Sequence, residues 1–182
     1  MFLPHCGAVP FMNKYLFEAK FEQLVVAVIV SLPTKKVLVA RMRDDAKNQL
    51  AGLMHFVGGP IISRQTPEES LCTHLDNKLY IRECDLHPLV RTQREGPLLG
   101  NDNRPSGSGK RYVSTDWFIV TVSTQPNEII HVDHNCDLHT GSAHWSTFTD
   151  LLDERRKWHL RGVSLNRTPT GEIYQALNTI ST

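Results

Sequence analysis

Apolar residues gather in short runs near the beginning of the chain. Residues 24–30 are apolar without interruption, which predicts a central strand that is buried on both faces. A second apolar run covers residues 37–40, and the polar segment 33–36 between the two runs suits a tight turn, so a hairpin is expected. Another short strand is predicted at residues 55–57, before two consecutive glycines.

The spacing of hydrophobic residues then changes from that of strands to that of a helix. Thr66 can cap a helix that begins with a proline and two glutamates, and Glu69 completes a capping box. Leu71, Leu75 and Leu79 recur every four residues, which places them on one buried face. We therefore expect a helix that begins at Thr66.

The second half of the chain predicts more strands and a final helix. Strands are expected at residues 86–93 and 112–122, and residues 96–110, rich in Gly, Asn, Asp, Pro and Ser, predict a mobile loop between them. A strand followed by a helix is expected from Trp145 through residue 152. A last helix begins near residues 168–169, and its apolar residues at helical spacing are Ile173, Ala176, Leu177 and Ile180. This order of elements predicts a mixed α+β domain.

Composition adds few constraints. The chain has 182 residues, 40% of them hydrophobic, and a formal net charge of +1. This suits one domain over residues 22–182 after an N-terminal extension of residues 1–21. The sequence has no basic stripe of the kind that indicates binding to duplex DNA. The longest apolar run is too short to span a bilayer, so no membrane partner is expected. The four cysteines form no C-x-x-C pair, which favours reduced thiols and an intracellular, cytoplasmic location.

Residues 58–81 carry a family resemblance. The signature of the Nudix (MutT-like) hydrolase superfamily reads G-x(5)-E-x(7)-R-E-U-x-E-E-x-G-U, where U is aliphatic. With Gly59 at its first position, Leu75 and Ile81 fall on the two aliphatic positions without a gap. The segment therefore resembles a Nudix box. The resemblance implies the Nudix-type α/β/α sandwich, with a mixed β-sheet between helices.

The residues that differ from the signature stand at its charged positions. Gln65 replaces the first glutamate, Thr73 replaces the arginine, and the three glutamates of the last block are replaced by His74, Asn77 and Lys78. In the family, glutamates of that block hold magnesium against a diphosphate. Since hard cations require anionic oxygen ligands, ordinary Nudix hydrolysis through this helix is not expected. The resemblance thus implies a degenerate motif and leaves enzymatic activity open.

Loss of the carboxylates does not remove the possibility of a binding site. His74, Asn77 and Lys78 lie at i, i+3 and i+4, so they share one helix face. One hypothesis is that Lys78, with His74, supplies directly the positive charge that metal ions supply in active relatives, and holds a nucleotide without cleaving it. The alternative is that the three residues form an ordinary solvated face.

Two further groups could contribute to ligand binding. Lys110 and Arg111 are cations at the edge of the expected loop, and they are candidates for contact with a ligand. Four aromatic residues could stack on a base, although core packing is the favoured interpretation for most of them. These residues are Phe56, Tyr112, Trp117 and Phe118.

Residues 131–139 hold the densest run of potential metal ligands. The candidates are Asp133, His134, Asp137 and His139. His, Cys and carboxylate side chains at short spacings can bind zinc, but this spacing matches no common zinc motif, so a polar surface loop is the alternative.

Two functional hypotheses follow. The favoured one is a non-catalytic Nudix-fold module that binds a nucleotide, an RNA or a protein partner, and no cofactor is assigned to it. The alternative is a divergent hydrolase of nucleoside diphosphate derivatives, such as nucleotide sugars or nucleoside triphosphates. It would use Mg or Zn and ligands from the segment 131–139.

Overall fold

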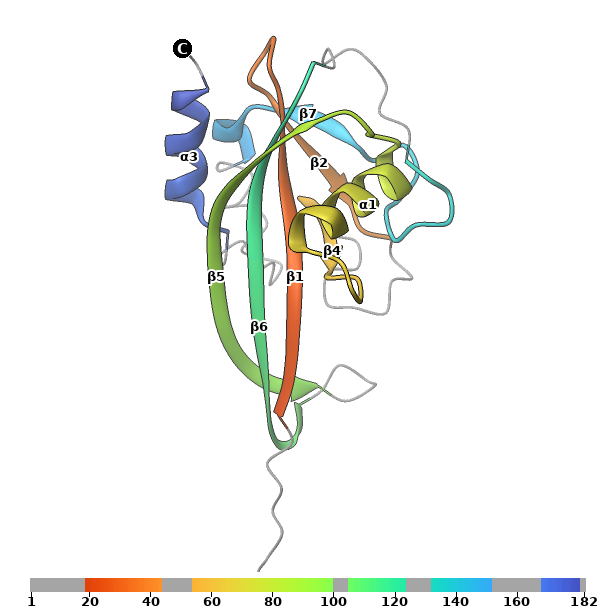
Figure 1. Cartoon of the computed structure of the whole chain (residues 1–182), viewed down its shortest axis with the longest axis vertical. Helices are drawn as coiled ribbons and strands as arrows, with labels where there is room; N and C mark the ends of the chain where they lie inside the picture. The colour runs from red at the N-terminus through yellow and green to blue at the C-terminus, as the bar shows by residue number, and fades with distance from the viewer. Residues whose placement is uncertain (1–18, 44–53, 100–104, 124–131, 152–167, 181–182) are drawn as a thin grey trace, which may run out of the picture.

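A computed structural model describes residues 19–43, 54–99, 105–123, 132–151 and 168–180. Its elements, all but β3 labelled in Figure 1, are β1 (Ala19–Ser31), β2 (Val37–Arg41), β3 (Met54–His55), β4 (Val57–Pro60), α1 (Pro67–Leu79), β5 (Asp85–Leu99), β6 (Pro105–Val122), β7 (His144–Ser146) and α3 (Thr170–Thr179). The first 18 residues of the expected N-terminal extension lie outside the described residues.

Strand β1 organises the sheet. It pairs in parallel with β6 along its whole length, from Ala19–Lys110 to Ser31–Val122. On its other side it pairs antiparallel with β4 and, near its end, with β2. The sheet order is β3-β2-β1-β6-β5, with β4 on β1 and β7 on β2. The prediction of a central strand over residues 24–30 is confirmed, although the strand is longer than its apolar run.

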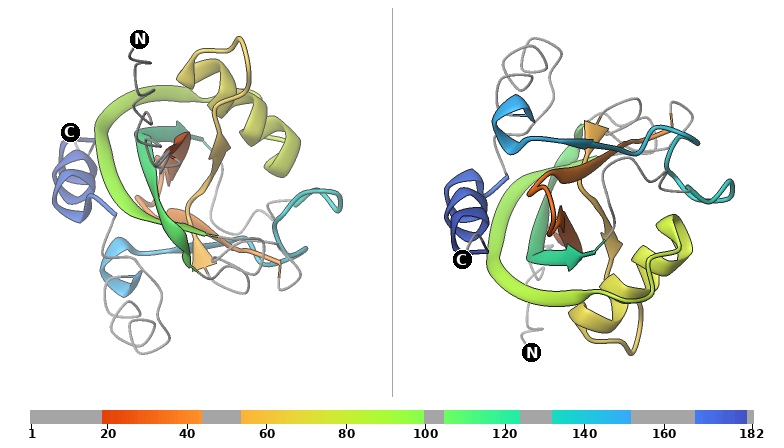
Figure 2. Two further views of the ribbon diagram at one scale, coloured as in Figure 1. Left: turned by 90° about the horizontal axis from the view of Figure 1, so that it is seen from below. Right: turned by 90° about the horizontal axis from the view of Figure 1, so that it is seen from above.

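The two faces of the sheet are covered by different helices. Val25, Ala27 and Ile29 of β1 pack on the side of α1, in one core with its three leucines. Val28 and Val30 point to the opposite side, into a second core with Ile173 and Leu177 of α3. Figure 2 shows the two helices on opposite sides of the strands. The uninterrupted apolar run is explained by this arrangement, and the expected mixed-sheet α/β/α sandwich is confirmed.

Helix α1 begins as the sequence predicts. The Thr66 hydroxyl accepts a hydrogen bond from the Glu69 amide at 3.2 Å, and the Glu69 carboxylate accepts one from the Thr66 amide at 2.8 Å. The helix ends at Tyr80, which adopts the left-handed conformation with φ of 57°. Among the described residues, no helix combines the length and apolar character needed to cross a membrane.

The expected loop at residues 96–110 is wrong. Strands β5 and β6 continue through most of it, with Gly96 paired to Arg111 and Pro97 to Lys110, and only residues 100–104 lie outside the described part. Because β5 is the last strand in the sheet order, a proline there need not interrupt a ladder between two neighbours. Pairing with β6 thus overrides a composition that is typical of loops. The expected strand at residues 55–57 is instead divided at Phe56 into β3 and β4.

Candidate functional site

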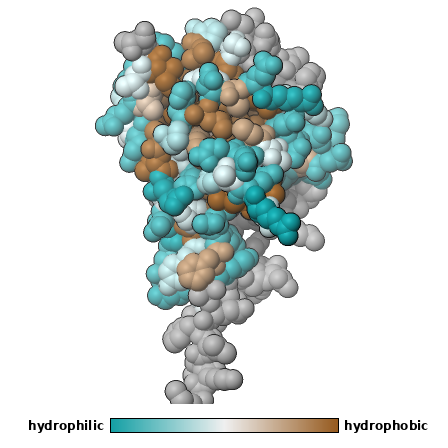
Figure 3. Space-filling model, viewed as in Figure 1, coloured by the Kyte–Doolittle hydropathy of each residue, from teal (hydrophilic) through white to brown (hydrophobic). Residues whose placement is uncertain are grey.

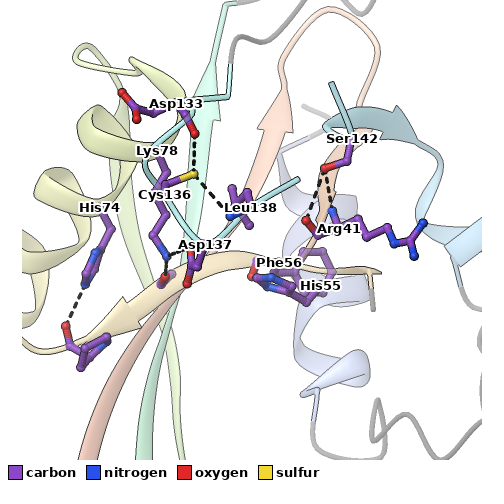
Figure 4. A network of polar contacts seen from close by, with 12 residues as sticks. Arg41, His55, Phe56, His74, Lys78, Asp133, Cys136, Asp137, Leu138 and Ser142 are labelled. Atoms are coloured by element: carbon purple, nitrogen blue, oxygen red, sulfur yellow. Dashed lines mark hydrogen bonds and ion pairs between the residues drawn. The ribbon is translucent and has the colours of Figure 1, made fainter. Parts of the chain in front are cut away.

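A polar network joins α1 to two other segments of the chain, the β3–β4 segment and the loop of residues 132–138 (Figure 4). Lys78 lies at its centre and is only 9% exposed. Its ammonium donates a hydrogen bond to the Gly58 carbonyl at 2.8 Å and forms an ion pair with the Asp137 carboxylate at 2.7 Å. Since an unpaired buried charge is strongly unfavourable, these two oxygens account for the position of Lys78 inside the protein.

The two glycines of β4 lie where other parts of the chain approach its backbone closely. A Cβ atom on Gly58 would lie 2.1 Å from the Val25 carbonyl oxygen of β1. A Cβ atom on Gly59 would lie 2.5 Å from the His74 ring. His74 is fixed over Gly59 by a contact of 2.8 Å between its Nε2 and the Pro60 carbonyl. Gly58 therefore has no room for a side chain, whereas a side chain at position 59 would have to displace the His74 ring.

The loop of residues 132–138 is attached to the C-terminal end of α1. The Asp133 amide donates to the Lys78 carbonyl at 3.0 Å, and the Tyr80 hydroxyl donates to the Asp133 carboxylate at 2.6 Å. The hydrogen bond from Tyr80 lowers the pKa of Asp133 and raises the pKa of Tyr80. These contacts place Asp137 beside Lys78. Tyr80 was not among the predicted site residues, although its place just after the helix could have suggested a capping role.

His55 adds a buried imidazole to the network. Its Nδ1 bonds to the Phe56 carbonyl, while its Nε2 is buried and has no hydrogen-bond partner in the described residues. Burial lowers the pKa of both His55 and His74, and the nearby Lys78 ammonium lowers each further. Both imidazoles thus favour the neutral form, so they add no positive charge to that of Lys78. Sequence reasoning missed His55, whose only signal was its place just before the two glycines.

The residues that align with the signature do not all converge. His74 and Lys78 point toward β4, but Asn77 is exposed and has no contact within the described network. Thr73 lies in the middle of α1, where its hydroxyl donates to the Glu69 carbonyl at 2.9 Å and lies 3.4 Å from the Gln65 side chain. The alternative of a solvated face is wrong for Lys78, because this side chain is buried.

The other two binding candidates lie at a distance from the network. Lys110 pairs with Glu95 at 2.6 Å, and Arg111 pairs with Glu22. In the sheet, Gly58 of the network pairs with Val26 of β1, and Val26 pairs in turn with Trp117 of β6. Arg111 precedes Trp117 by six positions, or about 20 Å of strand. The structure therefore does not bring Lys110 and Arg111 to the Lys78 network.

The potential metal ligands are also separated. Asp133 and Asp137 are engaged with α1, whereas the contacts of His134 and His139 are with Thr140, at 3.4 Å and 3.0 Å. Within the part of the chain that the structure describes, no three His, Cys, Asp or Glu side chains gather as metal ligands. His131, the first residue of the segment, lies outside that part.

Most of the aromatic candidates are core residues. Phe56, Trp117 and Phe118 are at most 8% exposed, and Phe56 meets Trp117 edge to face with ring centroids 6.3 Å apart. Tyr112 is partly exposed and stacks on Phe21. Core packing is thus confirmed for three of the four.

Comparison with known proteins identifies the fold. No family model and no curated protein matches the sequence. Among solved structures, DR0079 from Deinococcus radiodurans has 14% identity and a TM-score of 0.54, with 84% of this chain and 82% of that chain covered. The NUDIX domain of Shewanella oneidensis NrtR, complexed with ADP ribose, has 17% identity and a TM-score of 0.53, with 75% and 79% covered. The fold is Nudix-like.

A third structure supports the same conclusion. The E. coli dihydroneopterin triphosphate pyrophosphohydrolase has 14% identity and a TM-score of 0.51, with 72% of this chain and 85% of that chain covered. The Nudix-like fold of this chain therefore extends over most of its length, and α1 covers one face of its sheet.

Proposed function

We propose that this chain is a non-catalytic Nudix-fold module that binds a nucleotide derivative. In this proposal the Lys78 ammonium takes the place that a divalent cation has in hydrolytic relatives. The observation that carries it is the position of Nζ, 2.8 Å from the Gly58 carbonyl and 2.7 Å from the Asp137 carboxylate. A small cation is thus already built into the chain, held by the kind of oxygen atoms that hard metal ions prefer.

A resident metal does not fit these residues. The positions that align with the metal-binding glutamates carry a histidine, an amide and an ammonium. Asp137 already neutralises Lys78, and a second cation beside that ammonium would be repelled. The Nε2 atom of His74 is occupied by the Pro60 carbonyl. These contacts support a degenerate motif and disfavour hydrolysis through α1.

The remaining capacity of Lys78 suggests the ligand. An ammonium has three N–H donors, and Lys78 donates one hydrogen bond, to the Gly58 carbonyl, while Asp137 contacts it as an ion pair. A phosphate oxygen could accept from a remaining donor without displacing Asp137. The structural relative complexed with ADP ribose supports a nucleoside diphosphate derivative as the first compound to test.

Calorimetric titration tests the binding proposal. ADP-ribose, ADP and a nucleotide sugar are titrated with and without a chelator of divalent cations. We expect binding that is indifferent to the chelator, and no release of phosphate or sugar. Lys78→Glu should weaken binding at least about tenfold, because a charge-assisted hydrogen bond is replaced by repulsion. Lys35→Glu, at an exposed turn between β1 and β2, is the matched control and should bind like the wild type.

The same substitution tests the role of the ammonium. Lys78→Glu places a second carboxylate beside Asp137 and the Gly58 carbonyl, so Mn²⁺ should raise the melting temperature of this variant and leave the wild type unchanged. Metal-stimulated turnover by the wild type, abolished by changes at His74, Asp133 or Asp137, would contradict the proposal and establish the divergent hydrolase. Absence of nucleotide binding would refute the nucleotide ligand and leave a protein or RNA partner.

A further inference from the structure

A stacked aromatic pair lies far from the Lys78 network, at the beginning of β1 and on the neighbouring strand β6. Phe21 and Tyr112 are partners in the parallel β1–β6 ladder, with ring centroids 5.1 Å apart and planes 14° apart. Phe21 is 75% exposed. The pair belongs to the end of the sheet at the bottom of Figure 1, where Figure 3 shows a hydrophobic patch among hydrophilic residues. We call residues 20–23, 93–96 and 109–113 the lower sheet end.

The outer face of the Phe21 ring has no strand beside it. Tyr112 covers the side toward β6. On the other side of β1, the ladder with β4 begins only at Leu24, and the Gln23 carbonyl accepts a last hydrogen bond from the Ile61 amide. In the described residues, β1 is therefore an edge strand at Phe21. A third flat ring could continue the stack on that open side.

Cations outnumber anions in the lower sheet end. It contains Lys20, Arg94, Lys110 and Arg111 against Glu22 and Glu95, an excess of two positive charges, whereas the whole chain has a net charge of +1. Burial favours a neutral Glu22, but hydrogen bonds from Arg111 and Lys20 outweigh burial and lower its pKa. Glu22 is thus an anion that pairs with both Lys20 and Arg111. These three side chains together carry one net positive charge.

We propose that the lower sheet end binds single-stranded nucleic acid, with a base stacked on Phe21 and the backbone attracted by the surrounding cations. Stacking on an aromatic side chain tolerates any base, because every base has a flat π-face. Lys110, two positions from Tyr112 on β6, lies on the same face of the sheet as the two rings, and its side chain is 54% exposed, so it can reach a phosphate that flanks the stacked base. A duplex does not fit, because its bases are already stacked on one another. This site is independent of the proposed nucleotide site at Lys78.

Fluorescence anisotropy with the full chain tests the proposal. The probes are fluorescein-labelled oligouridylate and oligothymidylate of about twelve nucleotides, and a duplex of the same length. We expect both single strands to bind more tightly than the duplex, with an affinity that falls as salt increases. Phe21→Ala should weaken binding by about fivefold to a hundredfold, and Phe21→Trp should retain it. Tyr174→Ala removes an aromatic of 54% exposure on α3 and is the matched control, expected to bind like the wild type.

Three results would overturn the proposal. The first is equal binding by Phe21→Ala and the wild type. The second is duplex binding as tight as single-strand binding. The third is an absence of oligonucleotide binding by the wild type; if the wild type is then a dimer in sedimentation that Phe21→Ala dissociates, the lower sheet end is a contact between copies of the chain. Unchanged oligonucleotide binding by Lys78→Glu would show that this site and the Lys78 site are separate, whichever of the two proposals fails.

Discussion

The two ends of strand β1 place the same kinds of side chain in opposite environments. Toward its C-terminal end the strand is enclosed between α1 and α3, and residues 27–30 are fully buried. Toward its N-terminal end, the lower sheet end exposes 75% of Phe21. Lys78 and Lys20 each pair with a carboxylate, but their side chains are 11% and 61% exposed. Enclosure decides whether such a pair holds the protein together or is available to a partner.

The largest expected change in the free energy of unfolding comes from a substitution in the core at the enclosed end of β1. Leu75 is fully buried against β1, and Leu75→Ala should lower the free energy of unfolding by about 2–5 kcal/mol, because the cavity cannot collapse completely. Gln23→Ala, in the lower sheet end, should change it by less than about 0.5 kcal/mol. Urea denaturation of the two variants measures both values. Equal losses of unfolding free energy in the two variants would show that the lower sheet end is packed as tightly as the core between α1 and the sheet.

An intermediate change in the free energy of unfolding is expected when substitutions of Lys78 and Lys20 are compared. Lys78→Ala leaves the Gly58 carbonyl without its donor and the Asp137 carboxylate without its counter-ion, and it should cost about 1–3 kcal/mol of unfolding free energy. Lys20→Ala removes an exposed pair and should cost at most about 1 kcal/mol. The double variant Lys78→Met with Asp137→Asn should recover part of the loss. If Lys78→Ala melts like the wild type, the network does not stabilise the fold.

The smallest expected effect is a dependence on pH. The folded state lowers the pKa of His55 and His74, chiefly by burial, so the unfolded chain binds protons more readily. Stability is then complete above the unfolded pKa of about 6.5 and falls as the pH decreases through that value toward the folded ones. Melting curves at several pH values should show this slope, reduced in His74→Gln and unchanged in His87→Gln, at an exposed position of β5. A slope that both variants retain would exclude His74 as its source.

What the sequence predicts correctly in this protein is mostly local. The start of α1 depends on Thr66 and Glu69, three positions apart, and its buried face on leucines within two turns. By contrast, Lys78 and Asp137 meet across 59 positions, so nothing near Lys78 in the sequence predicts its burial. The expected loop at residues 96–110 fails for the same reason, because pairing between β5 and β6 outweighs the local preference of glycine and proline.

The long parallel ladder between β1 and β6 also bears on how the chain acquires its structure. During synthesis β1 leaves the ribosome before α1 and β5, and its partner Lys110–Val122 follows only after them. Until then a strand with an uninterrupted apolar run has one unpaired edge, which is prone to aggregation. Contacts of such large sequence separation also make folding slow. The chain is therefore expected to be most vulnerable while it is being made, and least once β6 has closed against β1.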